Sequence, residues 1–410
     1  MDSDLDQQTG LRVLPTGPRD AVDGLVPRAV VEPEDVEGTA RFLAWASRHG
    51  RRVVVRGGGT KLHWGNRPGA VDLILSTVRL ERLIEHAWAD MTATVEAGCT
   101  VAALQRRLAE RGQRLALDPL FADRATVGGV IATNDSGALR LRYGSVRDHL
   151  LGVRLVLADG TIARSGGKVV KNVAGYDLPK LMTGALGTLG VIVEATFRLY
   201  PLPSATRTLS LALDSLPRAN ELALAILDST LAPASVQIRA DSGSSGALLD
   251  VRFEGPPAAV GAQMERVRVL GRSATVAGED DGVWRAREEQ WDEANALVCK
   301  LSVLRSRLAD AIECAARVAE RHETRWHAVA QAFGLITLAF GHATAALIAE
   351  LRAALAPTGA SCVVLRAPLE VKKQVDVWGS AGDASFLMRR LREQFDPQRT
   401  LNPGRFVGGI

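Results

Sequence analysis

Cysteine is scarce in this sequence. The 410 residues include only four cysteines, and no two of them form a short Cys-x-x-Cys pair. A disulfide scaffold, a zinc ribbon and an iron–sulfur cluster held by this chain alone are therefore not expected. Four scattered thiols are typical of a protein from a reducing compartment.

Strong net charge and a membrane-spanning stretch are also missing. The formal charge is +4, and the arginines are spread along the chain without a basic run, so nucleic-acid binding is not expected. The longest stretch without charge, residues 328–349, contains Gln331 and His342 and reads as a buried strand followed by a helix rather than a bilayer helix. No secretory signal opens the chain. These absences predict a soluble, cytoplasmic protein.

The length and composition predict more than one domain. The chain is 47% hydrophobic, which is enough apolar material for two or three cores at about 150 residues each. A polar and loose segment is expected over 1–27, followed by a β-α-β rhythm up to the proline pair Pro201 and Pro203. The expected division is 1–27, 28–203, 204–389 with longer helices, one of them over 283–293, and a tail over 390–410. Within 28–203, Thr100 is expected to cap a helix and Asp159-Gly160 to form the turn of a hairpin.

The strongest motif is a strand that runs into three glycines. Val-Val-Val at 53–55 is followed by Arg56, Gly57–Gly59, Thr60 and Lys61. Glycines after a strand leave consecutive backbone N–H groups uncovered by side chains, as binding a pyrophosphate requires. The motif is neither a Rossmann fingerprint nor a P-loop. Taken alone, three glycines after a strand more often form a tight turn than a ligand site.

Two further glycine-rich segments follow. Residues 125–137 read ATVGGVIATNDSG, with Thr126 in position to cap a short helix, and residues 184–192 read GALGTLGVI. Paired glycines followed by small and polar residues leave room for a flat or phosphorylated ligand. Three such segments are difficult to explain as turns alone, so we expect them to converge on one ligand.

The order of these motifs resembles a known family. Arg-Gly-Gly-Gly-Thr at 56–60, Thr-Val-Gly-Gly-x-Ile-Ala-Thr-Asn at 126–134, Gly-Tyr-Asp-Leu at 175–178 and Gly-Thr-Leu-Gly-Val-Ile at 187–192 are similar to the FAD-binding domain of the vanillyl-alcohol-oxidase (PCMH-type) superfamily. Within it, the sequence most resembles the FAD-binding accessory subunit of bacterial glycolate oxidase. The tail, with Leu-Asn-Pro-Gly-Arg at 401–405, also resembles the C-terminal tail of that family.

This resemblance implies an α+β fold. It consists of a two-subdomain FAD-binding domain, an α+β cap-like domain and a C-terminal tail that returns to the flavin. FAD would be bound non-covalently, because Thr60 stands where covalent members carry a histidine.

The resemblance also implies roles for single residues. Arg56 to Lys61 would wrap the pyrophosphate through backbone amides, the second segment would line the flavin and ribityl chain, Val191 and Ile192 would meet the adenine end, and Asn402 would reach the isoalloxazine. The full set of expected cofactor-binding residues is Arg56, Gly57, Gly58, Gly59, Thr60, Lys61, Gly65, Asp118, Pro119, Thr126, Val127, Gly128, Gly129, Asn134, Ser136, Gly137, Gly144, Val191, Ile192 and Asn402.

The sequence departs from catalytic members of the superfamily. Those relatives carry metal-binding histidine runs in the second domain, whereas the nearest stretch here, 326–338, is apolar and no metal site is expected. They also carry an arginine and a threonine in the third loop that this chain lacks, which removes a bidentate carboxylate partner. Lys171 remains as the one catalytic candidate, to place positive charge near a reduced flavin, and the alternative is a surface lysine at a helix end.

These departures lead to a functional hypothesis with two alternatives. The preferred one is a non-covalent FAD subunit of a glycolate dehydrogenase-type complex, oxidising a 2-hydroxy acid (glycolate to glyoxylate) together with a related flavoprotein subunit and an iron–sulfur subunit. Such a complex would be cytoplasmic, or attached to a membrane through its partners. The alternatives are a self-sufficient 2-hydroxyacid dehydrogenase and a structural assembly subunit with vestigial FAD.

Overall fold

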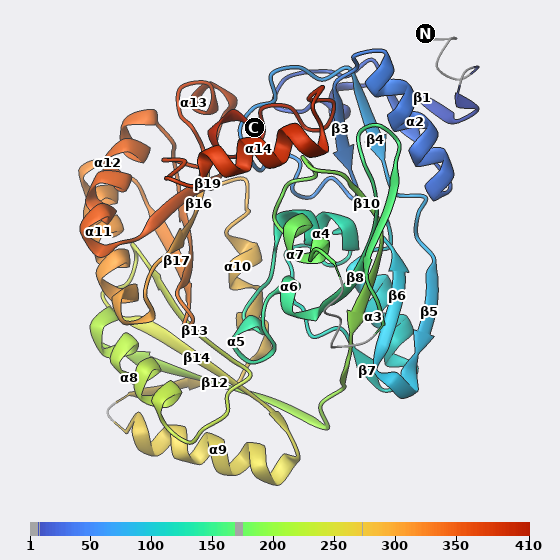
Figure 1. Ribbon diagram of the computed structural model, residues 1–410. Coiled ribbons are helices and arrows are strands. Elements are labelled where there is room, and N and C mark those ends of the chain that lie inside the picture. Colours follow the sequence, from blue (N-terminus) through green and yellow to red (C-terminus); the bar gives the residue numbers. More distant parts are fainter. Residues whose placement is uncertain (1–6, 8, 169–174, 273) are drawn as a thin grey trace. The chain divides into compact units, whose positions relative to one another are not determined.

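The computed structural model describes residues 7, 9–168, 175–272 and 274–410 (Figure 1). The chain divides into two compact units: unit 1 is Met1–Ser136, Ser145–Leu202 and Ser380–Ile410, and unit 2 is Gly137–Gly144 and Pro203–Gly379. The main division falls within one residue of the expected boundary at 203. The returning segment begins at 380 rather than 390, and the short stretch 137–144 joins unit 2.

Unit 1 begins with a small four-stranded sheet, in the order β1-β2-β4-β3. Its strands are β1 (Arg12–Pro15), β2 (Ala29–Glu32), β3 (Val53–Arg56) and β4 (Leu73–Ser76), and the pairs β2–β4 and β3–β4 are parallel. Helix α2 (Val36–Arg48) connects β2 to β3 and begins where the Asp35 side chain accepts a hydrogen bond from the N–H of Gly38. The predicted β-α-β unit is therefore present.

The expectation of a loose N-terminal segment over 1–27 is partly wrong. Strand β1 pairs antiparallel with β2, with Leu14 opposite Val30, and Val22 is buried against the same sheet. Although the segment is polar overall, its few apolar side chains pack against an apolar face of the sheet. Burial of those side chains, which composition does not reveal, orders the chain from about residue 9.

The second sheet of unit 1 has five antiparallel strands in the order β5-β6-β10-β8-β9. They are β5 (Leu83–Ala87), β6 (Thr92–Glu96), β8 (Leu150–Val156), β9 (Ile162–Gly166) and β10 (Val191–Arg198). A two-stranded ribbon adds β7 (Gln113–Arg114) and β11 (Tyr200–Pro201). The accompanying helices are α3 (Val101–Ala109), α4 (Val127–Thr133), α6 (Val146–His149) and α7 (Leu178–Met182).

The C-terminal tail packs against β3. After helix α14 (Ser385–Phe395), the N–H of Val53 donates to the carbonyl of Thr400, and the N–H of Asn402 donates to the carbonyl of Val53, both at 2.8 Å. Asp396 holds this turn by accepting from the N–H groups of Thr400 and Leu401. The tail therefore extends the sheet beside the strand that carries the glycine-rich loop.

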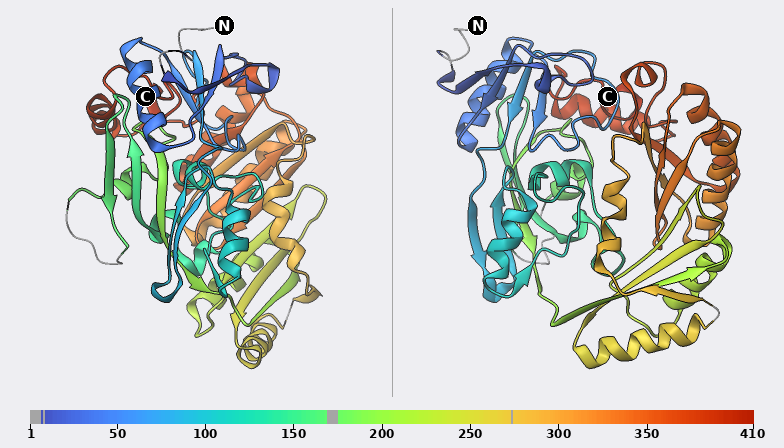
Figure 2. Two further views of the ribbon diagram at one scale, coloured as in Figure 1. Left: turned by 90° about the vertical axis from the view of Figure 1, so that its right-hand side faces the viewer. Right: turned by 180° about the vertical axis from the view of Figure 1, so that it is seen from behind.

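Unit 2 is built on one eight-stranded antiparallel sheet, in the order β15-β12-β14-β13-β17-β18-β16-β19. The strands are β12 (Ala205–Leu213), β13 (Ser235–Asp241), β14 (Ala247–Gly255), β15 (Thr275–Gly278), β16 (Leu297–Ser302), β17 (Trp326–Gln331), β18 (Leu335–Phe340) and β19 (Ser361–Arg366). Figures 1 and 2 show four helices along one face: α8 (Leu216–Asp228), α9 (Pro257–Leu270), α11 (Leu308–Arg321) and α12 (Ala345–Leu355).

The two faces of this sheet differ in polarity. Val236 and Ile238 of β13 are buried under the four helices, whereas the alternate residues Arg239 and Asp241 project from the opposite face. Short helices α5 (Arg140–Tyr143), α10 (Ala286–Glu289) and α13 (Leu369–Lys372) complete the unit. The helix expected over 283–293 is replaced by a 3-10 turn over Asp281–Arg285 and the single turn of α10.

Candidate functional site

The glycine-rich loop that follows β3 packs tightly against the second glycine segment. A Cβ atom at Gly57 would lie 2.0 Å from Oγ1 of Thr126, and one at Gly58 would lie 1.7 Å from the carbonyl oxygen of Arg124. Gly59 has φ +72°, in the left-handed region. These glycines are needed for close approach of the two loops and for one turn, in addition to exposing backbone amides.

The amides of this loop have no protein acceptor. Within the described part of the chain, no backbone N–H of residues 57–60 donates a hydrogen bond. The loop lines a cavity of about 70 Å³, together with Thr126, Gly129 and Arg405. Backbone N–H groups without an acceptor, beside a cavity, suit an anionic oxygen-rich group. The cavity is too small for a whole dinucleotide.

A second cavity of about 60 Å³ adjoins the first. The two share Val55, Gly57, Gly129, Ala132 and Leu186 in their walls. Together they bring all three predicted glycine segments and the tail to one place. The expected cofactor-binding residues that line one or both are Arg56, Gly57, Gly58, Gly59, Thr60, Lys61, Thr126, Gly128, Gly129, Val191, Ile192 and Asn402.

Asn402 uses its side chain to join segments of the protein. Its Nδ2 donates to the carbonyls of Leu186 (2.9 Å) and Gly187 (3.1 Å), and its Oδ1 accepts from the N–H of Val55 at 3.3 Å. A Cβ at Gly187 would lie 2.9 Å from that Nδ2 atom. Asn402 thus fixes the third glycine segment to β3, and its polar atoms already have protein partners.

Several expected residues serve packing at their positions. Val127 is buried in the core of the five-stranded sheet, and a Cβ at Gly128 would lie 2.9 Å from that of Ala97. Gly65 has φ +83°, and its missing Cβ leaves room for the carbonyl of Arg405. The glycine at each of these places is explained by contact with protein, whether or not a ligand lies nearby.

The other expected residues lie outside the two cavities. Asp118, Pro119, Asn134 and Ser136 belong to unit 1 without lining either cavity, whereas Gly137 and Gly144 belong to unit 2. Asn134, in the left-handed region with φ +48°, has a buried Oδ1 atom with no hydrogen-bond partner in the described residues. This oxygen is an acceptor available to a ligand. Lys171 lies outside the described residues.

Arg405 is a site residue that the sequence analysis missed. Its guanidinium is fully buried and lines the first cavity, where it donates to the carbonyls of Leu62 and Trp64 and to Oδ1 of Asn402. Burial lowers the pKa of Arg405 to about 10. It therefore brings a positive charge to the cavity with the uncovered amides. In the sequence, only the position of Arg405 in the tail motif over 401–405 could have indicated a role in the site.

The neighbouring cation, Arg56, is held by an acidic partner. Its Nη1 lies 2.6 Å from Oδ1 of Asp20, and this hydrogen bond lowers the pKa of the Asp20 carboxyl below its usual value. The Arg56 side chain is thus engaged with Asp20. This is consistent with the expectation that Arg56 contributes to the pyrophosphate site through its backbone amide. The ion pair also ties the N-terminal segment to the end of β3.

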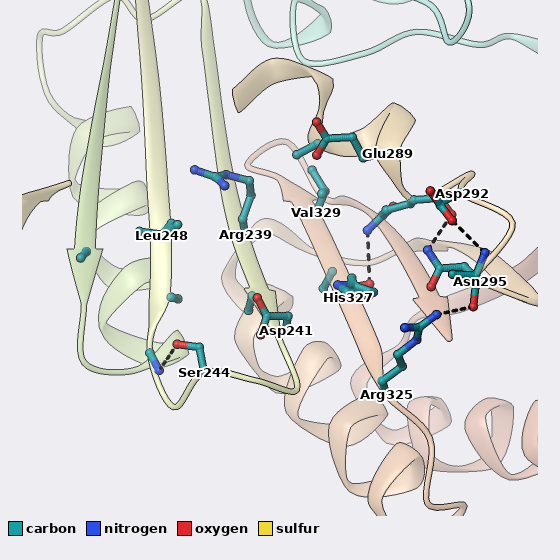
Figure 3. A pocket seen from close by; sticks show the side chains of 18 of the residues that line it. Arg239, Asp241, Ser244, Leu248, Glu289, Asp292, Asn295, Arg325, His327 and Val329 are labelled. Carbon is teal, nitrogen blue, oxygen red and sulfur yellow. Dashed lines mark hydrogen bonds between the residues drawn. The ribbon is translucent and has the colours of Figure 1, made fainter. Parts of the chain in front are cut away.

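Unit 2 has a larger cavity of its own, of about 480 Å³, on the polar face of its sheet (Figure 3). Its walls contain three carboxylates, from Asp241, Glu289 and Asp292. They also contain two guanidinium groups, from Arg239 and Arg325. Arg239 is already paired with buried Asp250 at 2.7 Å. The balance of charge in this cavity therefore does not favour a carboxylate ligand.

No metal centre is found in the part of the chain that the structure describes. No group of three or more His, Cys, Asp or Glu side chains there could hold a metal ion. The four cysteines are free, and three of them, Cys99, Cys299 and Cys362, are buried. No helix among the described residues is both long and apolar enough to cross a membrane.

Comparison with known families identifies the class of protein. Residues 27–166 match the family described as FAD binding domain. Two solved structures share the fold: p-cresol methylhydroxylase with substrate bound (TM-score 0.75, 16% identity, 93% of this chain and 89% of that one) and alkyldihydroxyacetonephosphate synthase (TM-score 0.75, 17% identity, 98% and 86%). The chain thus has the fold of these proteins and an FAD binding domain over residues 27–166, and the expected resemblance, fold class and cofactor are confirmed.

Sequence relatives narrow the class to oxidoreductases. The chain is 34% identical over 212 residues to glycolate oxidase subunit GlcD of Bacillus subtilis (52% of this chain, 45% of that protein) and 40% identical over 172 residues to D-lactate dehydrogenase of Archaeoglobus fulgidus (42% and 38%). It is also 30% identical over 294 residues to a probable mitochondrial D-lactate dehydrogenase of Danio rerio (66% and 59%). The chain is thus similar to FAD-linked oxidoreductases, and the match spans less than half the length of the first two relatives.

Proposed function

We propose that this chain is the non-covalent FAD subunit of a complex that oxidises a small 2-hydroxy acid such as glycolate. The observation that carries the proposal is the cavity formed by the uncovered amides of residues 57–60 and the buried cation Arg405. The names of the relatives, glycolate oxidase subunit and D-lactate dehydrogenase, support the substrate class. Thr60 in the loop supports a flavin held without a covalent bond.

The chain's own residues would bind and orient the cofactor. The backbone N–H groups of residues 57–60 would donate hydrogen bonds to the diphosphate oxygens, and Arg405 would balance part of their charge. Asn402 would keep the third glycine segment against β3, so that Val191 and Ile192 remain at the second cavity. When bound, FAD supplies the acceptor for a hydride from the substrate.

Catalysis by this chain alone has less support. Oxidation of a 2-hydroxy acid needs a cation for the carboxylate and a base for the hydroxyl proton. The unit 2 cavity contains His327, but its three carboxylates outnumber its two guanidinium groups, and no metal-ligand cluster is found in the described residues. We therefore propose that a second, related flavoprotein subunit provides the substrate site.

Electron transfer beyond the flavin would need another partner. Since the four cysteines are scattered and free, a self-held iron–sulfur cluster has no support in the described residues. We propose an iron–sulfur subunit as electron acceptor, with the complex in the cytoplasm or attached to a membrane through its partners. The free thiols are consistent with a reducing compartment.

An anaerobic titration separates this proposal from its two alternatives. The purified full-length chain is examined by visible spectroscopy, and glycolate or D-lactate is then added. A yellow protein that stays oxidised supports the FAD subunit, provided that adding the partner subunits restores bleaching. Bleaching of the chain alone would establish a self-sufficient dehydrogenase. A colourless protein that takes up no added FAD would favour a structural subunit and would contradict the proposal.

A further inference from the structure

A buried ion pair lies directly behind the glycine-rich loop. Nζ of Lys61 is 3.1 Å from Oδ2 of Asp135, and the two side chains are 5% and 0% exposed. Lys61 is the last residue of the loop, whereas Asp135 follows helix α4. The ammonium group is thus turned toward a carboxylate inside the protein, whereas the resemblance implies a role for Lys61 at the pyrophosphate only through its backbone amide.

Both members of the pair also hold Leu120. Nζ of Lys61 donates to the carbonyl of Leu120 at 3.2 Å, and the N–H of Leu120 donates to Oδ2 of Asp135 at 2.9 Å. The peptide groups on either side of Leu120 are therefore fixed by one ion pair. Leu120 directly follows Asp118 and Pro119, which the sequence predicts at the flavin.

Three stretches of chain meet at this point. The first is the loop over 57–61, whose amides face the cavity, and the second is the segment that ends at Leu120. The third is the end of α4, where Gly129 and Thr133 line the same cavity a few residues before Asp135. A change in the pair would alter the spacing of all three.

The charge of the pair is internally balanced. A buried ammonium matched by a buried carboxylate at 3.1 Å leaves little net charge for a nearby diphosphate. Removing one partner leaves the other buried and uncompensated, whereas replacing both with apolar residues avoids that cost. A variant that lacks one partner is therefore expected to be impaired more than a variant in which both are apolar.

We propose that Lys61 and Asp135 form a positioning pair, which assembles the three FAD-binding segments and does not itself contact the diphosphate. The proposal rests on the proposed FAD binding of this chain. It gives the side chain of Lys61 a role beside the backbone role that the resemblance implies. A lysine that binds phosphate would be indifferent to the loss of Asp135, or would bind more tightly once freed from it.

The test compares FAD dissociation constants of the full-length chain and its variants, measured well below the melting temperature of each. The single variants are Lys61→Met and Asp135→Leu, the double variant combines them, and Lys61→Arg is the conservative change. Lys180→Met is the matched control, because Lys180 is an exposed lysine whose partner, Asp177, is also exposed.

Both single variants are expected to raise the FAD dissociation constant at least tenfold, with Asp135→Leu as severe as Lys61→Met. The double variant should bind FAD better than either single variant, and it remains informative if a single variant fails to fold. Lys61→Arg should retain binding, and Lys180→Met should match the wild type.

Two results would overturn the proposal. Normal or tighter FAD binding by Asp135→Leu, together with weak binding by both variants that lack Lys61, would make Lys61 a phosphate ligand. Single variants that melt earlier but keep the wild-type dissociation constant would reduce the pair to a stabilising contact. A wild-type chain that binds no FAD would instead refute the proposed function, before any variant is compared.

Discussion

Gly129 offers a direct test of the diphosphate cavity. It lines both cavities of unit 1 and lies in helix α4 without a left-handed φ, so a side chain there strains no backbone torsion. A Cβ at this position would meet only Oγ1 of Thr126, at 3.2 Å. Gly129→Asp therefore adds a negative charge to the cavity wall with little disturbance of the fold.

The size of the effect follows from the distance between the two charges. Since Gly129 and the glycine-rich loop line the same cavity, we take a separation of about 5 Å between a phosphate bound there and the new carboxylate. At an effective dielectric constant of about 20, one pair of unit charges at that distance repels by 332/(20 × 5), about 3 kcal/mol. This energy corresponds to a loss of affinity of about two orders of magnitude for a single phosphate charge.

The assay is FAD binding to apoprotein, followed by quenching of flavin fluorescence, with Gly129→Asn as the matched control. Asn has nearly the size of Asp without its charge, so the difference between the two variants isolates electrostatics from sterics. Melting curves of both apoproteins check the fold. If Gly129→Asp binds FAD as tightly as Gly129→Asn, the diphosphate does not lie in this cavity and the assignment of the site is wrong.

Three further predictions concern the tail, a buried histidine and the buried cation. Asp396→Asn should lower the free energy of unfolding by about 3–5 kcal/mol in urea titrations, because it leaves buried Arg392 without its ion-pair partner at 3.0 Å; an unchanged midpoint would contradict this. Burial lowers the pKa of His149, so the folded protein keeps it neutral and loses stability as the pH falls below about 6.5, by up to about 1.4 kcal/mol per pH unit. His149→Asn should flatten that dependence in unfolding curves between pH 7.5 and 5, and equal slopes would refute the reasoning. Because the pKa of Arg405 is about 10, wild-type FAD affinity should fall above that pH, whereas Arg405→Met should bind at least tenfold more weakly at pH 8 and show no such fall; parallel pH profiles would exclude a role for its charge.

Much of the local structure could be predicted from the sequence. The Val-Val-Val run at 53–55, the caps at Thr100 and Thr126 and the turn at Asp159-Gly160 all appear where their chemistry predicts. Each depends on a few consecutive residues, because capping, turn formation and alternation are short-range effects. The helix expected over 283–293 is wrong: the structure has a 3-10 turn over Asp281–Arg285 and the single turn of α10 there.

The roles of single residues in the site were less predictable. The glycine pattern indicated an anion-binding loop, but it could not reveal that Gly57 and Gly58 also admit the second loop at very short range. Nor could it reveal that the ammonium group of Lys61 turns to Asp135, 74 residues further along the chain. Such contacts depend on how distant segments pack, and no local pattern reports that.

By itself, the sequence determined the class of this protein: which strands end in glycines, where backbone amides are uncovered, and therefore which kind of ligand the chain can hold. Those properties follow from torsion preferences and missing side chains, which each residue carries with it. Only the tertiary structure decided which cation lies at the amides, because Arg405 reaches them from the far end of the chain through packing of the tail against β3. Charge acts through space, and the distances that determine its effect are set when the chain has folded.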